Sequence, residues 1–308
     1  MPSPFVRLGD VVRQFGIEPD AVRLVSRRQN VHWRVRARGG EVYALRRFGV
    51  WAETPGDVEW EIGCVNALAD AGLPVPRPIG GARRIGGATW LMAPWLRGRP
   101  LWRPSRDPPA TDADYESLGE RLAEFHAVAA ALPGPPQRPA WSDCVSGAFP
   151  LSGGAERRAL LLGELAKVAP DLAARLGQAA ADLAARNLPR IFAGYRRQFV
   201  HGDFSPWNVR VRQGRLVGLL DFDLAHLDFR ASDVAAARRG YHDGVVRGYL
   251  RVARLDAEEL SSLEALWLGG SLRGVWWVLE SRLAEGRMSA HGLQWNIEQL
   301  EKTRPYPA

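Results

Sequence analysis

The sequence has few cysteines and no long apolar segment, and each shortage excludes a class of protein. Cys64 and Cys144 are the only cysteines among 308 residues, too few for a disulfide framework or a cysteine-ligated zinc site. No apolar run reaches the roughly 18 residues that a membrane-spanning helix needs. The N-terminal segment lacks a charged start followed by an apolar stretch, so it does not indicate a signal peptide. These absences predict a cytoplasmic protein with reduced thiols and no membrane association.

Lysine is also scarce, because the basic residues are almost all arginine. Only Lys167 and Lys302 are lysines, although Lys and Arg together number 41 against 34 Asp and Glu, and the net charge is +7. This balance favours an anionic partner such as a nucleotide, and nucleic-acid binding is one alternative. The basic residues are scattered, without a dense run, so we predict that nucleic acid is not a partner. The sequence leaves a monomer and a homodimer open.

One segment, residues 199–223, arranges polar side chains around a predicted β-hairpin. Two short apolar runs within it read as strands, and the turn between them falls at 213–214. Asp203 and Asn208 stand at the entry of this hairpin, and Asp221 stands at its exit. The fold of the hairpin therefore predicts that three oxygen-bearing side chains converge on one point.

These three side chains have the chemistry that phosphoryl transfer requires. A carboxylate must orient and deprotonate the attacking hydroxyl, and metal ligands must neutralise charge on the phosphates. Asp203 fits the first role. Asn208 and Asp221 fit the second, because Mg²⁺ prefers oxygen ligands and shares its shell with phosphate oxygens and water. The alternative is a hairpin with solvated acidic ends.

The motif His201-Gly202-Asp203, four further residues, Asn208 and a hairpin to Asp221 resembles the catalytic loop and metal-binding turn of the aminoglycoside phosphotransferase and choline kinase-like superfamily. The resemblance implies an α+β, two-lobed protein-kinase-like fold. Its N-terminal lobe is an antiparallel sheet with one helix, and its larger C-terminal lobe is mostly helical. We expect a nucleotide-covering lobe at 1–93, a hinge at 94–100 and a catalytic and substrate-binding lobe at 101–308.

The front of the chain fits this expectation. Residues 20–48 alternate as strands, with a hairpin turn at Gly39-Gly40, and 89–92 reads as a buried strand. Residues 57–71 read as a helix with an apolar stripe that consists of Val58, Ile62, Val65 and Ala69. By the resemblance, the turn at 27–30 lies over the nucleotide phosphates.

The resembled family usually presents a lysine to these phosphates from the third strand. No lysine precedes Lys167 here, so Arg46 takes that position. Arginine keeps the charge and binds phosphate through two nitrogens, but its reach and geometry differ. The resemblance pairs this cation with a helix glutamate, which is Glu61, with Glu59 as the rival. A solvated strand end and a surface glutamate are the alternatives.

The resemblance also implies roles for several other residues. In the hinge, the backbone of Ala93 and Trp95 would bind adenine, with Met92 nearby. His201 would brace the catalytic loop, Asp223 would support the metal from a second position, and Asp233 would cap a helix or hold the loop.

The rest of the chain predicts a helical scaffold. Thr111 is a candidate N-cap, and His126, on the helix that follows, is expected to be a packed residue. Residues 133–154 are rich in Gly and Pro, 155–187 read as two helices separated near Pro170, and 243–302 read as mainly helical. Four tryptophans of this last region form core or line a substrate pocket: Trp267, Trp276, Trp277 and Trp295.

Together these features predict a kinase that uses ATP, or another nucleoside triphosphate, with Mg²⁺ to phosphorylate a hydroxyl of a small molecule. The acceptor is an aminoglycoside-like antibiotic, or a metabolite such as homoserine, choline or a sugar. A basic chain without an acidic cluster after Asp223 favours the smaller or less charged acceptors. Because the strand lysine is missing, a catalytically weak or inactive nucleotide-binding protein on the same fold is the alternative.

Overall fold

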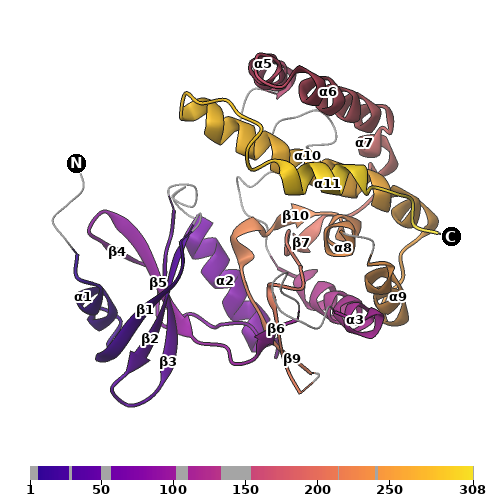
Figure 1. Ribbon diagram of the computed structural model, residues 1–308. Helices are drawn as coiled ribbons and strands as arrows, with labels where there is room; N and C mark the ends of the chain where they lie inside the picture. Colours follow the sequence, from indigo (N-terminus) through magenta and orange to yellow (C-terminus); the bar gives the residue numbers. More distant parts are fainter. Residues whose placement is uncertain are drawn as a thin grey trace. The chain divides into compact units, whose positions relative to one another are not determined.

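In the computed structural model the chain divides into two units (Figure 1), formed by Met1–Leu101 with Trp207–Asp223 and by Trp102–Pro206 with Leu224–Ala308. The structure describes residues 6–27, 30–49, 57–101, 110–132, 154–213, 215–239 and 242–307. The hairpin with Asn208 and Asp221 thus belongs to the first unit, and the bounds 1–93, 94–100 and 101–308 stay a prediction. Within the described ranges, no helix has the length and apolar character needed to cross a membrane.

The first unit contains a five-stranded antiparallel sheet, and the three strands predicted in 20–48 are present in it. The order is β1-β2-β3-β5-β4, so the strand predicted at 89–92 lies beside β3. The bounds are β1 Pro19–Arg27, β2 Val31–Ala37, β3 Val42–Arg47, β4 Arg83–Ile85 and β5 Ala88–Pro94. The turn predicted at 27–30 lies partly outside the described residues.

Alternation along the strands separates the two faces of this sheet. Trp33, Leu45 and Met92 pack on one face, together with Val11 and Val12 of a short helix, α1 (Leu8–Arg13), that the sequence did not predict. A second, smaller cluster joins the strands to helix α2 (Asp57–Asp70) and consists of Phe48, Val58 and Leu91. Arg46 follows Leu45 and therefore points away from the α1 core.

The predicted hairpin forms a second small sheet in the first unit, in the order β6-β8-β9. Its strands are β6 (Arg99–Pro100), β8 (Val209–Arg212) and β9 (Arg215–Leu219). Antiparallel pairing of Arg99 with Val211 joins the predicted hinge to the hairpin. Gln213, whose φ is 52°, follows β8 at the predicted turn, and Gly214, the other residue predicted there, lies outside the described residues.

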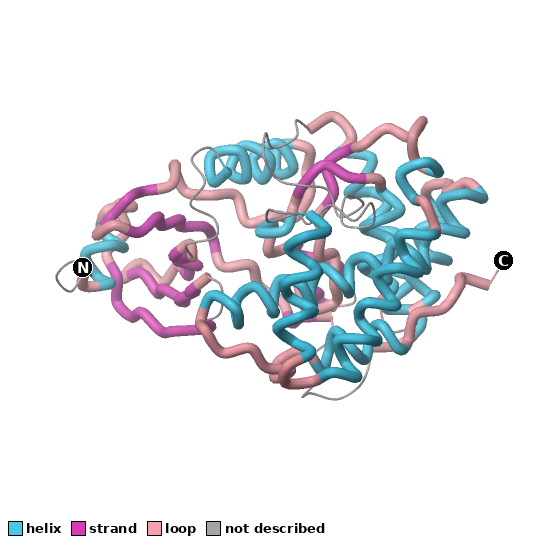
Figure 2. Tube along the Cα trace, turned by 90° about the horizontal axis from the view of Figure 1, so that it is seen from above, coloured by secondary structure: helices cyan, strands magenta, loops and turns pink. Residues whose placement is uncertain are grey.

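The second unit is mostly helical (Figure 2), as predicted. Thr111 forms a capping box with Asp114 at the start of α3, and Pro170 opens α6. The helices are α3 Asp112–Ala129, α5 Gly154–Ala166, α6 Pro170–Ala185, α7 Leu188–Ile191, α8 Arg230–Arg238, α9 Asp243–Val252, α10 Ala257–Ala284 and α11 Gln294–Glu301. Nearly all of the Gly/Pro-rich segment predicted at 133–154 lies outside the described residues.

Two features of the second unit position the catalytic-loop segment. Strands β7 (Gln198–Val200) and β10 (His226–Asp228) pair antiparallel, and the His201-Gly202-Asp203 motif follows β7 directly. Helices α3 and α9 approach closely at Gly248, where an added Cβ would lie 1.8 Å from the carbonyl oxygen of Glu116. This contact requires a glycine, and it fixes α9 on the helix that carries His126.

Candidate active site

Arg46 lies on the face of the sheet that meets α2. It pairs with His32 of β2 and with Leu91 of β5, so these three side chains share that face. Nη1 of Arg46 donates to Oε1 of Glu61 at 2.7 Å, and the two side chains are only 12% and 5% exposed. The expected partner is therefore Glu61, whereas Glu59 is exposed on the same helix.

The buried stripe of α2 differs from the predicted one. Val58 and Val65 are buried as expected, but Ile62 and Ala69 are only half-buried. Glu61 occupies the middle of the buried stripe. A carboxylate is tolerated there because it is paired with a cation, and a charged group is rarely buried without a partner. The buried face of α2 is therefore turned toward Glu61 relative to the predicted stripe, and Ile62 still packs against the Phe48 cluster.

Asp223 joins the same cluster. Nη2 of Arg46 and Nδ2 of Asn30 both donate to the Asp223 carboxylate, and Oδ1 of Asn30 accepts from the amide of Gly49 at 2.9 Å. Asn30 is buried and was not identified from the sequence, in which an asparagine before a strand usually indicates a turn. Arg46 and Asn30 are thus both direct partners of Asp223.

Burial and the neighbouring charges shift the pKa values of three groups in this cluster. Burial alone would lower the pKa of Arg46, but the carboxylates of Asp223 and Glu61 outweigh it and raise the pKa above its ordinary value. Burial raises the pKa of Asp223 to about 6, against the lowering effect of Arg46. Burial, and next the charge of Arg46, lowers the pKa of His32 to about 4, so this imidazole is neutral near pH 7.

A cavity of about 280 Å³ opens beside Arg46, within the first unit. This volume is close to the lower end of the roughly 300–1,000 Å³ typical of small-molecule sites. Its lining combines polar side chains with apolar residues around them. The residues at this cavity include His32, Arg46, Glu61, Ala93, Trp95, Asn208, Arg210 and Asp221.

The hairpin brings Asn208 and Asp221 to this cavity. The carbonyl oxygen of Asn208 accepts from the amide of Leu220 at 2.9 Å, so the entry and exit of the hairpin are neighbours. Asp221 has φ of +70°, a left-handed conformation that is uncommon for a residue other than glycine. Such strained residues cluster at functional sites, where the surrounding structure fixes them.

The donors fit a magnesium–phosphate complex better than a metal centre made by protein alone. Among the described ranges, no three His, Cys, Asp or Glu side chains are arranged to hold a metal ion. Asn208 and Asp221 supply hard oxygen donors at one cavity, and Mg²⁺ completes such a partial shell with phosphate oxygens and water. In the part of the chain that the structure describes, Nε of Arg46 is buried without a hydrogen-bond acceptor.

Of the three residues predicted near adenine, two line the cavity and one does not. Ala93 and Trp95 line the cavity, whereas the side chain of Met92 packs in the α1 core on the other face of the sheet. The Trp95 amide donates to the carbonyl oxygen of Val42 at 2.9 Å, so this amide is not available to adenine. Adenine binding by the backbone of Ala93 and by the carbonyl group of Trp95 stays a prediction, with Met92 near them in the chain but its side chain in the α1 core.

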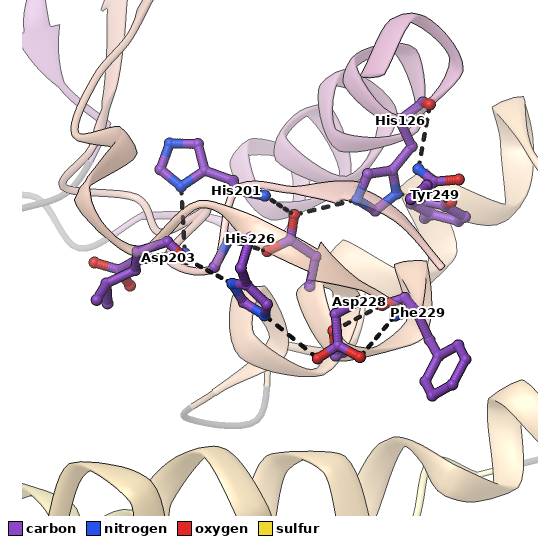
Figure 3. Close-up of polar contacts among 12 residues, drawn as sticks. His126, His201, Asp203, His226, Asp228, Phe229 and Tyr249 are labelled. Atoms are coloured by element: carbon purple, nitrogen blue, oxygen red, sulfur yellow. Dashed lines mark hydrogen bonds and ion pairs between the residues drawn. The ribbon is translucent and has the colours of Figure 1, made fainter. Parts of the chain in front are cut away.

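The loop predicted to be catalytic belongs to the second unit, and Figure 3 shows His201 and Asp203 of this loop. Gly202 has φ of +77°, and an added Cβ would lie 2.1 Å from the carbonyl oxygen of Leu224, so only glycine fits this turn. The amide of Asp203 donates to Nδ1 of His201 at 3.2 Å. The ring of His201, itself buried, packs against Phe125 and Phe204. These contacts place His201 as a support of the loop.

The side chain of Asp233 binds the backbone of the same loop. Its carboxylate accepts from the amide of His201 at 2.8 Å and from the amide of Gly202 at 2.9 Å. Asp233 lies within α8, whose N-cap is Phe229, so of the two predicted roles the structure supports holding the loop and not capping. Burial acts to raise the pKa of Asp233, but the hydrogen bond and charge of His126 and His201 outweigh it and lower the pKa.

His126 completes this buried network and was not identified from the sequence as a site residue. Nε2 of His126 donates to Asp233 at 3.2 Å, and its Nδ1 lies 3.0 Å from the hydroxyl of Tyr249 (Figure 3). A histidine on the apolar stripe of α3 is usually only packed, so no sequence pattern indicated this contact. The network links α3, α8 and α9 to the loop that carries Asp203.

Asp203 is itself paired. Its Oδ1 accepts from Nη2 of Arg239 at 2.7 Å, and the two side chains are 21% and 10% exposed.

The tryptophans considered for a substrate pocket differ in burial. Trp267 and Trp276 are buried in the core, and Trp295 is 42% exposed with its ring 5.3 Å from the guanidinium carbon of Arg239.

These arrangements can be compared with known proteins. Residues 20–267 match the model of the phosphotransferase enzyme family. The chain belongs to this family. The match covers both the Arg46–Glu61 pair and the catalytic loop, and it confirms the resemblance inferred from the motif.

Relatives and solved structures of the phosphotransferase family agree with this assignment. A homoserine kinase of Sinorhizobium fredii is 28% identical over 239 residues, which cover 70% of this chain and 66% of that protein. An aminoglycoside phosphotransferase, APH(4)-Ia, in complex with ADP and hygromycin B, has a TM-score of 0.65 at 17% identity, over 95% of each chain. Amicoumacin kinase hAmiN, with AMP-PNP and Ca²⁺, has a TM-score of 0.64 at 14% identity over 96% of this chain and 92% of its own. At these identities the structures confirm the kinase-like fold.

Proposed function

We propose that this phosphotransferase-family protein transfers the γ-phosphoryl group of ATP to a hydroxyl of a small molecule. The observation that carries the proposal is the gathering of Arg46, Glu61, Asn208 and Asp221 at one cavity in the first unit. A buried cation and two oxygen donors are what a nucleotide with its divalent cation requires. The loop that carries Asp203, held by Asp233, supplies the second half of the chemistry.

In the proposed reaction, the carboxylate of Asp203 accepts the proton of the acceptor hydroxyl as the oxygen attacks the γ-phosphorus. The bond between that phosphorus and the bridging oxygen breaks, and ADP leaves with the electron pair. No covalent enzyme intermediate is needed, because positioning and charge stabilisation supply most of the catalysis. Arg46, oriented by Glu61, binds the phosphates. The Ala93–Trp95 side of the cavity binds the adenine ring of ATP.

Asn208 and Asp221 would hold Mg²⁺, which neutralises phosphate charge and orients the γ-phosphoryl group when it is bound. The hydrogen bond between Asn208 and Leu220, next to the left-handed turn at Asp221, holds the two donors near each other before the nucleotide binds. Asp223, within two residues of Asp221, is committed to Arg46 and Asn30. We therefore assign Asp223 to the support of the phosphate-binding arginine.

For the acceptor, we favour a small hydroxy amino acid such as homoserine over a polycationic antibiotic. Two observations support this choice: the relative with the homoserine kinase name, and the Arg239 guanidinium 2.7 Å from the proposed base. A fixed cation at the base opposes an acceptor with several ammonium groups, because like charges a few ångströms apart repel strongly in a partly buried site. The protein is proposed to act in the cytoplasm, as a monomer or homodimer.

The test is an ATP-consumption panel with homoserine, choline, simple sugars and aminoglycosides, in the presence of Mg²⁺. We expect turnover with homoserine, and loss of at least roughly 10³-fold of kcat in Asp203→Asn, because the general base is removed. ATP affinity of this variant should stay within twofold of the wild type. Full turnover by Asp203→Asn would contradict the mechanism.

The second candidate function is nucleotide binding without turnover. The observation that favours it is Arg46, which replaces the usual lysine and is engaged by two carboxylates, Glu61 and Asp223. Mg²⁺-dependent binding of ATP by the wild-type protein, with no product from any acceptor of the panel, would support this candidate over the kinase.

A further inference from the structure

Arg239 has a fixed position next to the proposed base. It is the first residue after α8, with φ of −43° and ψ of 133°, so the chain turns away from the helix at this point. Eight of the nine residues of α8 are buried, which anchors the helix end. The side chain of Arg239 is therefore attached to a rigid element rather than to a loose loop.

Contacts with Asp203, Ala236 and Trp295 orient the guanidinium of Arg239. Nη2 donates to Oδ1 of Asp203 at 2.7 Å, and Nε donates to the carbonyl oxygen of Ala236 at 2.8 Å. The second of these acceptors is one of the last carbonyls of α8, which lack a partner within the helix. The indole ring of Trp295, on α11, lies 5.3 Å from the guanidinium carbon. Cation–π contact of this kind holds an arginine without occupying its donors.

We propose that Arg239 is a positioning residue for the base: it fixes the plane of the Asp203 carboxylate, and Trp295 fixes Arg239. This inference rests on the proposed function, because it assigns Asp203 to the acceptor proton. The carboxylate of Asp203 is attached through two rotatable bonds and is 21% exposed, so it needs a partner to keep one orientation. A guanidinium held at Nε and stacked on a ring provides that partner in the absence of substrate.

A merely structural role for Arg239 makes a different prediction. If Arg239 only stabilised the fold, loss of its ion pair would lower stability without a specific effect on turnover. Arg247 is a control for the loss of an arginine ion pair, because it is 42% exposed and pairs with Asp112 and Glu116 on α3. Arg238 is unsuitable as a control, because it is buried and holds the carbonyl oxygens of Arg304 and Pro305.

The test compares Arg239→Met, Arg239→Lys and Arg247→Met in the full-length protein, with ATP, Mg²⁺ and the acceptor of the panel. We expect Arg239→Met to lower kcat by about 100-fold, the scale of a small misplacement of a reacting group. KM for ATP should stay within twofold, because the cavity assigned to ATP lies in the first unit. Arg239→Lys should recover part of the loss, and Arg247→Met should match the wild type.

A double-mutant cycle separates positioning from folding. If Arg239 acts through Asp203, Arg239→Met should cause no further loss of kcat in an Asp203→Asn background. Trp295→Ala should lower kcat less than Arg239→Met does, with Trp295→Phe near the wild type, and this effect should also vanish in the Asp203→Asn background.

The possible outcomes are distinguishable. Unchanged kcat in Arg239→Met, or equal losses in both backgrounds, would overturn the positioning role while leaving the kinase intact. If Arg239→Met fails to fold, Arg239→Lys and Trp295→Ala decide by the same cycle. A wild-type protein that phosphorylates no acceptor would instead overturn the proposed function.

Discussion

Arg46 of β3 and Glu61 of α2 form a buried ion pair at 2.7 Å, on the face of the sheet that meets the cavity. The strand register turns Arg46 to this face, and the helix places Glu61 in the middle of its buried stripe. The pair therefore depends both on the two-residue alternation of strand β3 and on the 3.6-residue repeat of helix α2. It is also the contact from which nucleotide binding can be tested most directly.

Glu61→Gln should raise KM for ATP about tenfold and lower the free energy of unfolding by roughly 3 kcal/mol, because it removes one partner of a buried ion pair. Glu59→Gln, on the exposed side of α2, should change the free energy of unfolding by less than about 0.5 kcal/mol and leave KM unchanged. Steady-state kinetics and urea unfolding measure both quantities. Equal behaviour of the two variants would show that the Arg46–Glu61 pair is unimportant for ATP binding.

Asp233→Asn should destabilise the protein by roughly 3 kcal/mol, because the amide cannot accept from two backbone amides and His126 as the carboxylate does. The loop that carries Asp203 should lose its geometry, so kcat should fall as well. Asp182→Asn, on the exposed side of α6, is the control. Urea unfolding and kcat of the two variants test this. An unchanged kcat in Asp233→Asn would show that the Asp233 network is not needed for catalysis.

Gly202→Ala should destabilise the protein by roughly 3 kcal/mol or more, because its φ is +77° and the new Cβ would meet the carbonyl oxygen of Leu224. Gly163→Ala has the opposite expectation. Gly163 is exposed within α5, nothing lies within 4 Å of an added Cβ, and alanine should stabilise the helix by about 1 kcal/mol. Thermal unfolding of both variants would show opposite shifts, and a neutral Gly202→Ala would contradict the described loop.

The contribution of His32 to stability should fall as pH falls from 6.5 toward 4, whereas Asp223, whose pKa burial raises to about 6, contributes in the opposite direction. Burial, and next Arg46, lowers the pKa of His32 to about 4, whereas the unfolded chain has the ordinary value of 6.5. In this interval the unfolded state binds a proton that the folded state excludes, so His32 contributes stability that is present above pH 6.5. The loss reaches at most roughly 3 kcal/mol.

Urea unfolding at several pH values across this interval measures the effect. His32→Gln should flatten the pH dependence in part, because burial also lowers the pKa of His242 to about 4 and that contribution persists. An unchanged pH profile in His32→Gln would show that His32 is not kept neutral by the fold.

The sequence by itself determined the features that depend on local pattern. The spacing from Asp203 through Asn208 to Asp221 identified the family, alternation predicted the strands, and Thr111 marked the start of a helix. Each of these features depends on residues close to one another along the chain, because local side-chain chemistry and backbone preference determine strands, turns and helix starts.

The tertiary structure decided which distant side chains meet. Asp223 contacts Arg46 across 177 positions, His126 contacts Asp233 across 107, and Arg239 contacts Asp203 across 36. Apolar periodicity reports only which face of an element is buried, so it placed Glu61 beside the buried stripe of α2 and gave no role to His126. Buried polar groups need partners, and only the folded chain determines which partner each one has.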